Sequence, residues 1–152
     1  MKLTSRNGSQ LGLSIVGYQF PDLATVPYDS NWLNICVRVV HPRGSWTATD
    51  PSLLTYEVAR LADWLDAVAR GARVEPEESF LEPNLRFELT HSSLEPSLRV
   101  YFDLESRPKW APVDGAGNDD LYVEFPLEEI DLAGAAAILR KQLQAFPQRT
   151  PR

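Results

Sequence analysis

Carboxylates are the side chains whose type and spacing come closest to supporting catalysis in this sequence. Glu82, with either Asp103 or Glu124 on a facing strand, could act as the acid–base pair that hydrolyses a glycoside. That mechanism requires one carboxyl group with a raised pKa in an apolar pocket. The simpler alternative, which we favour, is that Glu82 bonds backbone amides at a strand end or pairs with Arg86 or Arg99.

Other catalytic and metal-binding patterns are absent from the sequence. It contains no glycine-rich phosphate loop, nucleophile elbow, His-Glu-x-x-His motif or pair of cysteines. His41 and His91 end two predicted strands far apart in the chain, so we interpret both as turn or surface residues. Cys36 lies in an apolar run and is expected to be a buried thiol. We therefore expect no catalytic residue, no metal site and no cofactor.

Acidic side chains are concentrated in one part of the chain. The 152 residues have a net charge of −6, and residues 74–129 carry fourteen acidic but only four basic side chains. This distribution would repel a phosphate backbone, so we expect no nucleic-acid partner. It would attract a basic protein, mainly by raising the association rate. The alternative is that the acidic residues only form a well-solvated surface.

A protein interface also needs aromatic anchors. Trp32, Trp46 and Trp64 fall on predicted strands or a predicted helix and are expected in the core. Trp110 lies in a proline-rich loop, where it either anchors a partner or folds back over the sheet. The residues that we expect to contact a partner are Glu75, Glu77, Glu78, Glu82, Trp110, Asp114, Asp119 and Asp120.

Two amphipathic helices are expected to position these segments. Asp50 is the predicted N-cap of the first helix, Pro51 its first residue, and Gly71 its end. Asp131 is the predicted N-cap of the second helix, which Pro147 ends. Apolar side chains recur at steps of three and four on both, at Leu54, Val58, Leu61, Leu65 and Val68, and at Leu132, Ala136, Leu139, Leu143 and Phe146.

Strands are predicted wherever apolar and polar residues alternate. The Asn7-Gly8 dipeptide is a hairpin signal between the first two strands. Proline and glycine make residues 21–31 and 106–120 loops. The predicted strands are residues 2–5, 11–20, 32–41, 45–49, 85–89, 98–104 and 121–125, with the start of another at 79–81.

This order of elements lacks a regular alternation of strand and helix. We therefore predict an α+β fold with an antiparallel β-sheet and two amphipathic α-helices packed on it. The length fits one domain, residues 1–152, with a hairpin and loop in 1–31 and a frayed tail in 147–152. No signal peptide or membrane-spanning run is visible, which predicts a cytoplasmic protein without a membrane partner.

Several short motifs resemble the WapI-type immunity proteins and related uncharacterised bacterial domains. The resemblance lies in their order and spacing and extends from residue 32 to residue 149; it leaves the role of residues 1–31 open. The motifs are Trp32-Leu33, Asp50-Pro51-Ser52-Leu53, Leu61-Ala62-Asp63-Trp64-Leu65, Phe80-Leu81-Glu82-Pro83-Asn84-Leu85 and Phe146-Pro147-Gln148-Arg149.

The resemblance implies a non-catalytic protein that binds and neutralises the toxic C-terminal domain of a polymorphic toxin, often a nuclease. A nuclease usually presents a basic surface to its substrate, which an acidic protein can occupy without chemistry. We place the contact surfaces at residues 75–82 and 107–120. The alternatives are an interaction domain without a toxin partner and a small hydrolase using acidic residues. The sequence does not define the oligomeric state.

Overall fold

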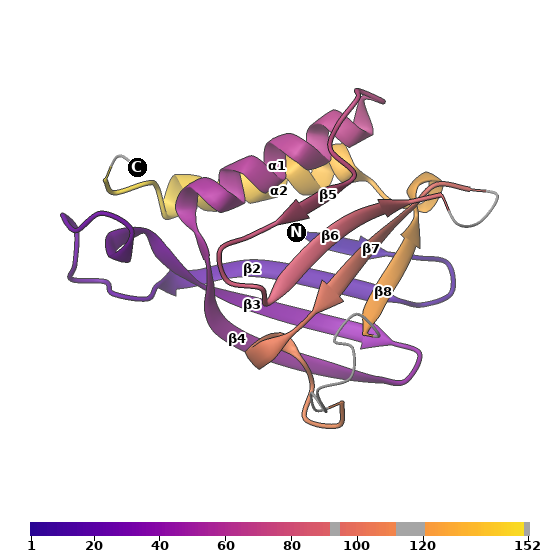
Figure 1. The fold of residues 1–152 in the computed structure, drawn as a ribbon, viewed down its shortest axis with the longest axis horizontal. Helices are drawn as coiled ribbons and strands as arrows, with labels where there is room; N and C mark the ends of the chain where they lie inside the picture. The colour runs from indigo at the N-terminus through magenta and orange to yellow at the C-terminus, as the bar shows by residue number, and fades with distance from the viewer. Residues whose placement is uncertain (92–94, 112–120, 151–152) are drawn as a thin grey trace.

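The first half of the chain forms a four-stranded antiparallel sheet, here called the N-terminal sheet. The computed structural model describes residues 1–91, 95–111 and 121–150. Neighbouring strands in this sheet follow chain order (Figure 1). The strands are β1 (Lys2–Thr4), β2 (Gln10–Tyr18), β3 (Trp32–His41) and β4 (Gly44–Leu54).

Local sequence signals explain most of this sheet. The turn between β1 and β2 contains Gly8 with φ of 92°, the positive value that the Asn7-Gly8 dipeptide predicts. The bounds of β3 match the prediction, since alternate residues such as Ile35 and Val37 are buried. The loop predicted for residues 21–31 is present, although it ends in a short 3-10 helix, η1 (Asp29–Asn31).

The second half of the chain forms another four-stranded antiparallel sheet, the C-terminal sheet, also in chain order. Three of its strands confirm predicted ones within a few residues, while β5 begins two residues before the predicted start. A 3-10 helix, η2 (Leu104–Ser106), follows β7, and another, η4 (Leu127–Glu129), follows β8. The strands are β5 (Glu77–Ser79), β6 (Leu85–Thr90), β7 (Ser97–Phe102) and β8 (Tyr122–Pro126).

The first helix, α1 (Thr55–Ala69), starts later than predicted. The prediction that Asp50 caps it is wrong, because β4 continues through Asp50 and Pro51, which pair with β3. Pro51 is tolerated near a β-bulge in this edge strand, where no ladder N–H is required. The N-cap is Leu54 instead, and its backbone N–H donates to Oε1 of Glu57 in the first turn at 3.0 Å. Gly71 follows the helix with φ of 70°, as predicted.

The second helix, α2 (Leu132–Ala145), confirms its predicted cap. Asp131 Oδ1 accepts the N–H of Gly134 at 2.9 Å, and the helix ends before Phe146. Leu132, Ala136 and Leu139 are buried on the predicted face. An amphipathic stripe therefore docks this helix on the rest of the molecule.

The two helices pack on each other along one side of the paired sheets (Figure 1). One buried cluster joins both sheets and both helices and includes Leu13, Val37, Leu61, Phe87 and Leu139. The α+β class with antiparallel pairing is confirmed. The sequence pattern did not show that the strands divide into two sheets, because strand periodicity identifies a buried face but not the element opposite it.

The chain end after α2 makes specific contacts. We expected residues 147–152 to form a frayed tail; residues 151–152 lie outside the described part. Tyr18 Oη donates to the carbonyl of Pro147, and the Arg149 guanidinium lies 3.6 Å from the centre of the Tyr18 ring. The backbone N–H of Arg149 donates to Asn31 Oδ1 at 2.9 Å. Residues 147–150 are thus bonded to β2 and to the loop before β3.

Candidate partner-binding surfaces

The acidic segment, residues 75–82, runs along α1 and includes β5. Three helix residues spaced by one turn hold it. Trp64 Nε1 donates to the carbonyl of Glu75 at 2.9 Å, Arg60 Nη2 donates to the carbonyl of Ser79 at 2.7 Å, and Glu57 Oε2 accepts the N–H of Leu81 at 2.8 Å. Residues three and four apart share one helix face, so α1 supports the segment along its length.

Two of the predicted contact residues in this segment already have cationic partners. Glu78 pairs with Arg60, and Glu77 Oε2 lies 3.2 Å from Arg86 Nη1. Glu75 is exposed and Glu82 half-buried, and no ion pair joins either to a cation in the described part of the chain. The negative charge available to a partner is therefore greatest at the two ends of the segment.

The outer face of the C-terminal sheet carries stacked arginine and tyrosine side chains. The Arg86 guanidinium lies 3.9 Å from the centre of the Tyr101 ring, and that of Arg99 lies 4.4 Å from the Tyr122 ring. Arg99 Nε donates to Glu124 Oε1 at 2.9 Å, and this hydrogen bond raises the pKa of Arg99. Such cation–π pairs fix the side chains on this face of the sheet in the free protein.

The three carboxylates considered for hydrolysis do not share a pocket. Asp103 lines a hollow of about 170 Å³, whose wall includes Arg86 but neither Glu82 nor Glu124. That volume is below the usual size of a small-molecule site. Glu124 instead pairs with Arg99 on the open sheet face. This geometry lacks the paired acid and base that glycoside hydrolysis requires.

Trp110 packs on the protein, which is one of the two roles considered for it, and its side chain is 40% exposed. Its ring centre lies 5.6 Å from that of Trp46 and 6.2 Å from that of His41. A Cβ placed at Gly44 would lie 3.2 Å from the Trp110 ring, so the glycine makes room for it. The guanidinium of Arg43 lies 5.4 Å from the ring centre. The other predicted contacts of this region, Asp114, Asp119 and Asp120, lie outside the described residues.

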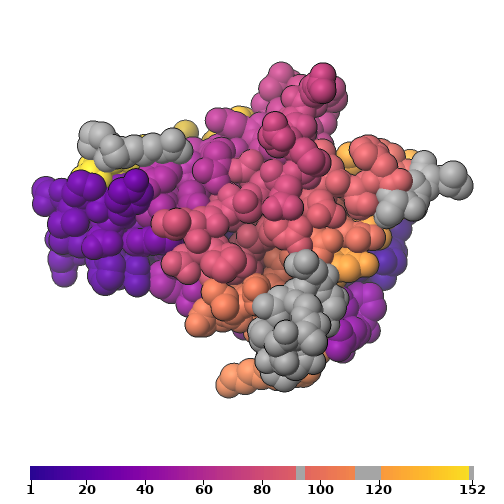
Figure 2. Space-filling model, viewed as in Figure 1, coloured from indigo at the N-terminus to yellow at the C-terminus, as the bar shows by residue number. Residues whose placement is uncertain are grey.

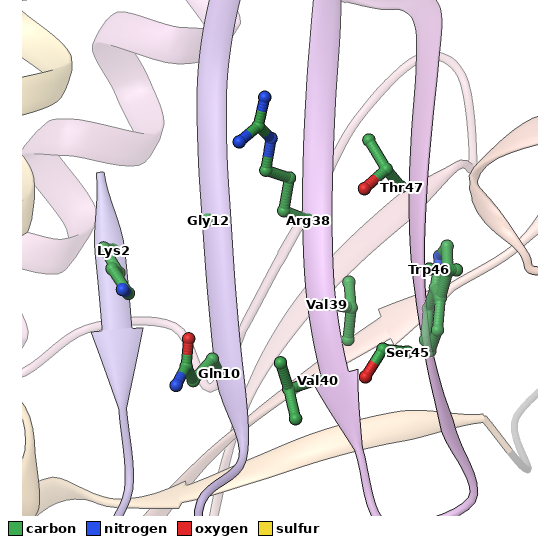
Figure 3. Close-up of a pocket in the computed structure, with 9 residues that line it drawn as sticks. All are labelled: Lys2, Gln10, Gly12, Arg38, Val39, Val40, Ser45, Trp46 and Thr47. Carbon is green, nitrogen blue, oxygen red and sulfur yellow. The ribbon is translucent and has the colours of Figure 1, made fainter.

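The outer face of the N-terminal sheet has the opposite charge. A shallow groove of about 570 Å³ crosses it, with Lys2 and Arg38 among the residues drawn in Figure 3. Gly12 leaves space between the strands that carry them, and the rest of the lining is neutral. The groove is therefore basic, although the whole chain has a net charge of −6.

Residues 1–91, 95–111 and 121–150 contain no group of three or more His, Cys, Asp or Glu side chains able to hold a metal ion. Within the same ranges, neither helix has the length and apolar character needed to cross a membrane.

The sequence matches the model of one known protein family. Residues 2–147 match the model of the immunity protein WapI-like family. The chain belongs to the WapI-like family. The match includes residues 2–31, which the motif resemblance did not reach. Comparisons with curated proteins and with solved structures gave no match. Membership of this immunity protein family is consistent with toxin neutralisation through a protein partner.

One exposed region of this WapI-like chain was missed by sequence reasoning. Four large apolar side chains are exposed on two segments, where two of them fall in the predicted loop 21–31 and the other two at the ends of the predicted strands 11–20 and 79–81. Tyr28 is 54% exposed and Leu81 66%. The sequence signal for this region was the presence of large apolar residues among turn formers. A loop that only connects two elements lies on the surface and gains no stability from such residues. The other two are Phe20 and Val26.

Proposed function

We propose that the chain is an immunity protein that neutralises a basic toxin domain by covering its surface, without chemistry of its own. The observation that carries this proposal is the match to the WapI-like immunity protein family over residues 2–147. The fourteen acidic side chains in residues 74–129 support it, because they favour a basic partner. The partner would be the C-terminal domain of a polymorphic toxin, possessing nuclease activity, and neutralisation would take place in the cytoplasm.

The proposed contact surface consists of the acidic segment and the loop that carries Trp110. Glu75 and Glu82 would provide negative charge, since neither is paired with a described cation. Glu77 and Glu78 would contribute less because Arg86 and Arg60 compensate them. Trp110 offers a half-exposed aromatic face held by Trp46. Asp114, Asp119 and Asp120 would extend the acidic rim.

Blocking a surface in this way needs rigidity more than flexibility. The helix contacts of the acidic segment and the ion pairs of Glu77 and Glu78 fix that segment in the free protein. A preordered surface loses less conformational entropy on binding. Exposed carboxylates would speed the encounter with a basic partner, and salt would screen that effect.

Charge reversal tests the proposed surface. The probe is a catalytically inactive form of the toxin C-terminal domain encoded next to this chain. Glu75→Lys and Glu82→Lys should each weaken binding by about tenfold at low salt, mainly through slower association. The matched control is Glu128→Lys, because Glu128 is an exposed carboxylate on η4, away from the acidic segment.

Surface plasmon resonance at several salt concentrations would measure both rates. The difference between the test variants and Glu128→Lys should shrink as salt rises. If both test variants bind as the control does, with the same salt dependence, the acidic segment is not the contact surface. If the unmodified chain does not bind the toxin domain at all, the proposed function is wrong.

A further inference from the structure

A hollow of about 350 Å³ opens at the N-terminal end of α1, between the loop of residues 19–31 and the end of the acidic segment. We call it the apolar hollow. In Figure 2 the indigo surface of the loop lies beside the pink surface of residues near 80. Five of its eight lining residues are aromatic or aliphatic. The lining residues are Tyr28, Leu54, Tyr56, Glu57, Arg60, Ser79, Phe80 and Leu81.

The rim of the apolar hollow exposes an unusual amount of apolar surface. Tyr28 and Leu81 face solvent from opposite segments with 54% and 66% of their surfaces exposed. Phe20 at 42% and Val26 at 39% extend the exposed apolar surface of the loop. Contiguous apolar patches on a protein surface mark sites of association, whereas single exposed residues do not.

The backbone at Tyr28 is held in a strained conformation. Tyr28 has φ of 62° and ψ of −64°, and the N–H of Asp29 donates to the carbonyl of Pro27 at 2.8 Å. This is a γ-turn of the rare positive-φ kind, which is unfavourable for a bulky residue. Strain of this type persists only where the surroundings fix it, and it concentrates at functional sites.

Buried polar contacts provide that support. Ser30 and Asn31 are fully buried at the end of the loop. Ser30 Oγ accepts the N–H of Val26 at 2.8 Å, and Asn31 Oδ1 accepts the hydroxyl of Thr55 at 2.9 Å. The Arg149 guanidinium donates to two loop carbonyls, those of Phe20 at 3.1 Å and Leu23 at 2.8 Å. The loop is therefore ordered before any partner binds, which favours affinity.

Acidic residues flank the apolar hollow on both sides. The loop of residues 19–31 contains Asp22 and Asp29 but no basic residue, and Arg149 is bonded to it from the segment after α2. The acidic segment contains four glutamates but no basic residue, and two of the four are paired with arginines. The cation that lines the hollow, Arg60, is paired with Glu78 and bonded to the Ser79 carbonyl. An apolar centre with a negative rim is complementary to a basic surface that carries an apolar side chain.

We propose that the apolar hollow receives an apolar side chain from the basic face of the toxin domain, with Tyr28 and Leu81 as the binding anchors. This inference rests on the proposed function and assigns the centre of the interface to two apolar residues that were not among the predicted contact residues. Leu81 lies within the acidic segment, and Tyr28 lies outside both predicted contact surfaces. The acidic residues then form the rim, where they govern the association rate. The aromatic and aliphatic anchors govern the dissociation rate.

Two substitutions test the anchors. Tyr28→Asn removes the ring while placing at this positive φ a residue type that tolerates it better, and Leu81→Ser shortens a side chain that is mostly in solvent. Each should weaken binding of the inactive toxin C-terminal domain by about 30-fold, mainly through faster dissociation. The control is Val40→Ser, because Val40 is 38% exposed and lines the basic groove of the N-terminal sheet.

Kinetic binding at fixed salt, with circular dichroism to verify folding, separates the outcomes. Loss of affinity in the two test variants, with Val40→Ser unchanged, supports the anchors. If the unmodified chain binds the toxin domain and all three variants bind equally well, the apolar hollow is not the contact, although the proposed function stands. Loss of binding in Val40→Ser alone places the contact on the N-terminal sheet. Absence of binding by the unmodified chain overturns the proposed function itself.

Discussion

Tyr28 and Trp110 are both exposed aromatic residues, but the protein holds them in different ways. They lie near opposite ends of β3. Tyr28 lies in the loop before Trp32, the first residue of the strand, and Trp110 packs on His41, its last residue. Trp110 contacts Trp46, His41 and Gly44, whereas the Tyr28 ring has one aromatic neighbour among the described residues, Tyr56, at 6.3 Å between ring centres. Exposure alone therefore does not distinguish a packing residue from a presented one.

The largest effect expected from this comparison is on stability. Trp110→Ala should lower the free energy of unfolding by about 2 kcal/mol, because the packed side of the ring is lost from Trp46 and His41. Tyr28→Asn should lower it by less than about 1 kcal/mol, as for most surface substitutions. Urea unfolding followed by tryptophan fluorescence and circular dichroism would measure both. Equal losses of unfolding free energy would show that Tyr28 is packed as firmly as Trp110.

A smaller effect is expected at the glycine beneath Trp110. Gly44 has φ of 151°, and an added Cβ would lie 3.2 Å from the indole ring. Gly44→Ala should therefore lower the free energy of unfolding by about 1 kcal/mol. Part of that loss should disappear when Trp110 is already alanine, because the steric contact is gone while the backbone strain remains. A double-mutant cycle measures this difference, and strict additivity would mean that Gly44 does not make room for Trp110.

The smallest effect concerns pH. Burial lowers the pKa of His41 below its usual 6.5, Arg43 lowers it further, and a hydrogen bond to the Tyr122 backbone opposes the change. The unfolded chain then binds a proton more readily than the folded one, so His41 makes stability fall as pH drops through and below 6.5. His41→Gln should flatten this fall between pH 7 and pH 5 in urea unfolding. An unchanged slope would show that His41 does not contribute to it.

The predictable parts of the fold were those determined by local chemistry. The alternation in β3, the Asp131 cap and Gly71 each depend on a few neighbouring residues, and each is confirmed. The helix start predicted at Asp50-Pro51 was wrong because the same dipeptide can start a helix or continue an edge strand. Pairing with β3 decided between them, and such pairing is not visible in the local sequence.

The candidate site was less predictable for the same reason. Charge counts identified the acidic segment, but the pairing of Glu78 with Arg60 depends on how β5 docks on α1. Tyr28 and Leu81 are 53 positions apart and meet only around the hollow at the start of that helix. A sequence pattern describes neighbours along the chain, whereas this surface is assembled from loops that the fold brings together.

The contact between Asn31 and the chain end has a consequence for protein synthesis. Asn31 Nδ2 donates to Thr150 Oγ1 at 2.8 Å, and Arg149 donates both to Asn31 and to the loop carbonyls. Strands and helices upstream begin to fold as they leave the ribosome. The loop that presents Tyr28 must wait for Arg149 and Thr150, which follow Asn31 by 118 and 119 residues in the chain. A nascent or C-terminally shortened chain would therefore contain the framework of the protein before it has the finished loop.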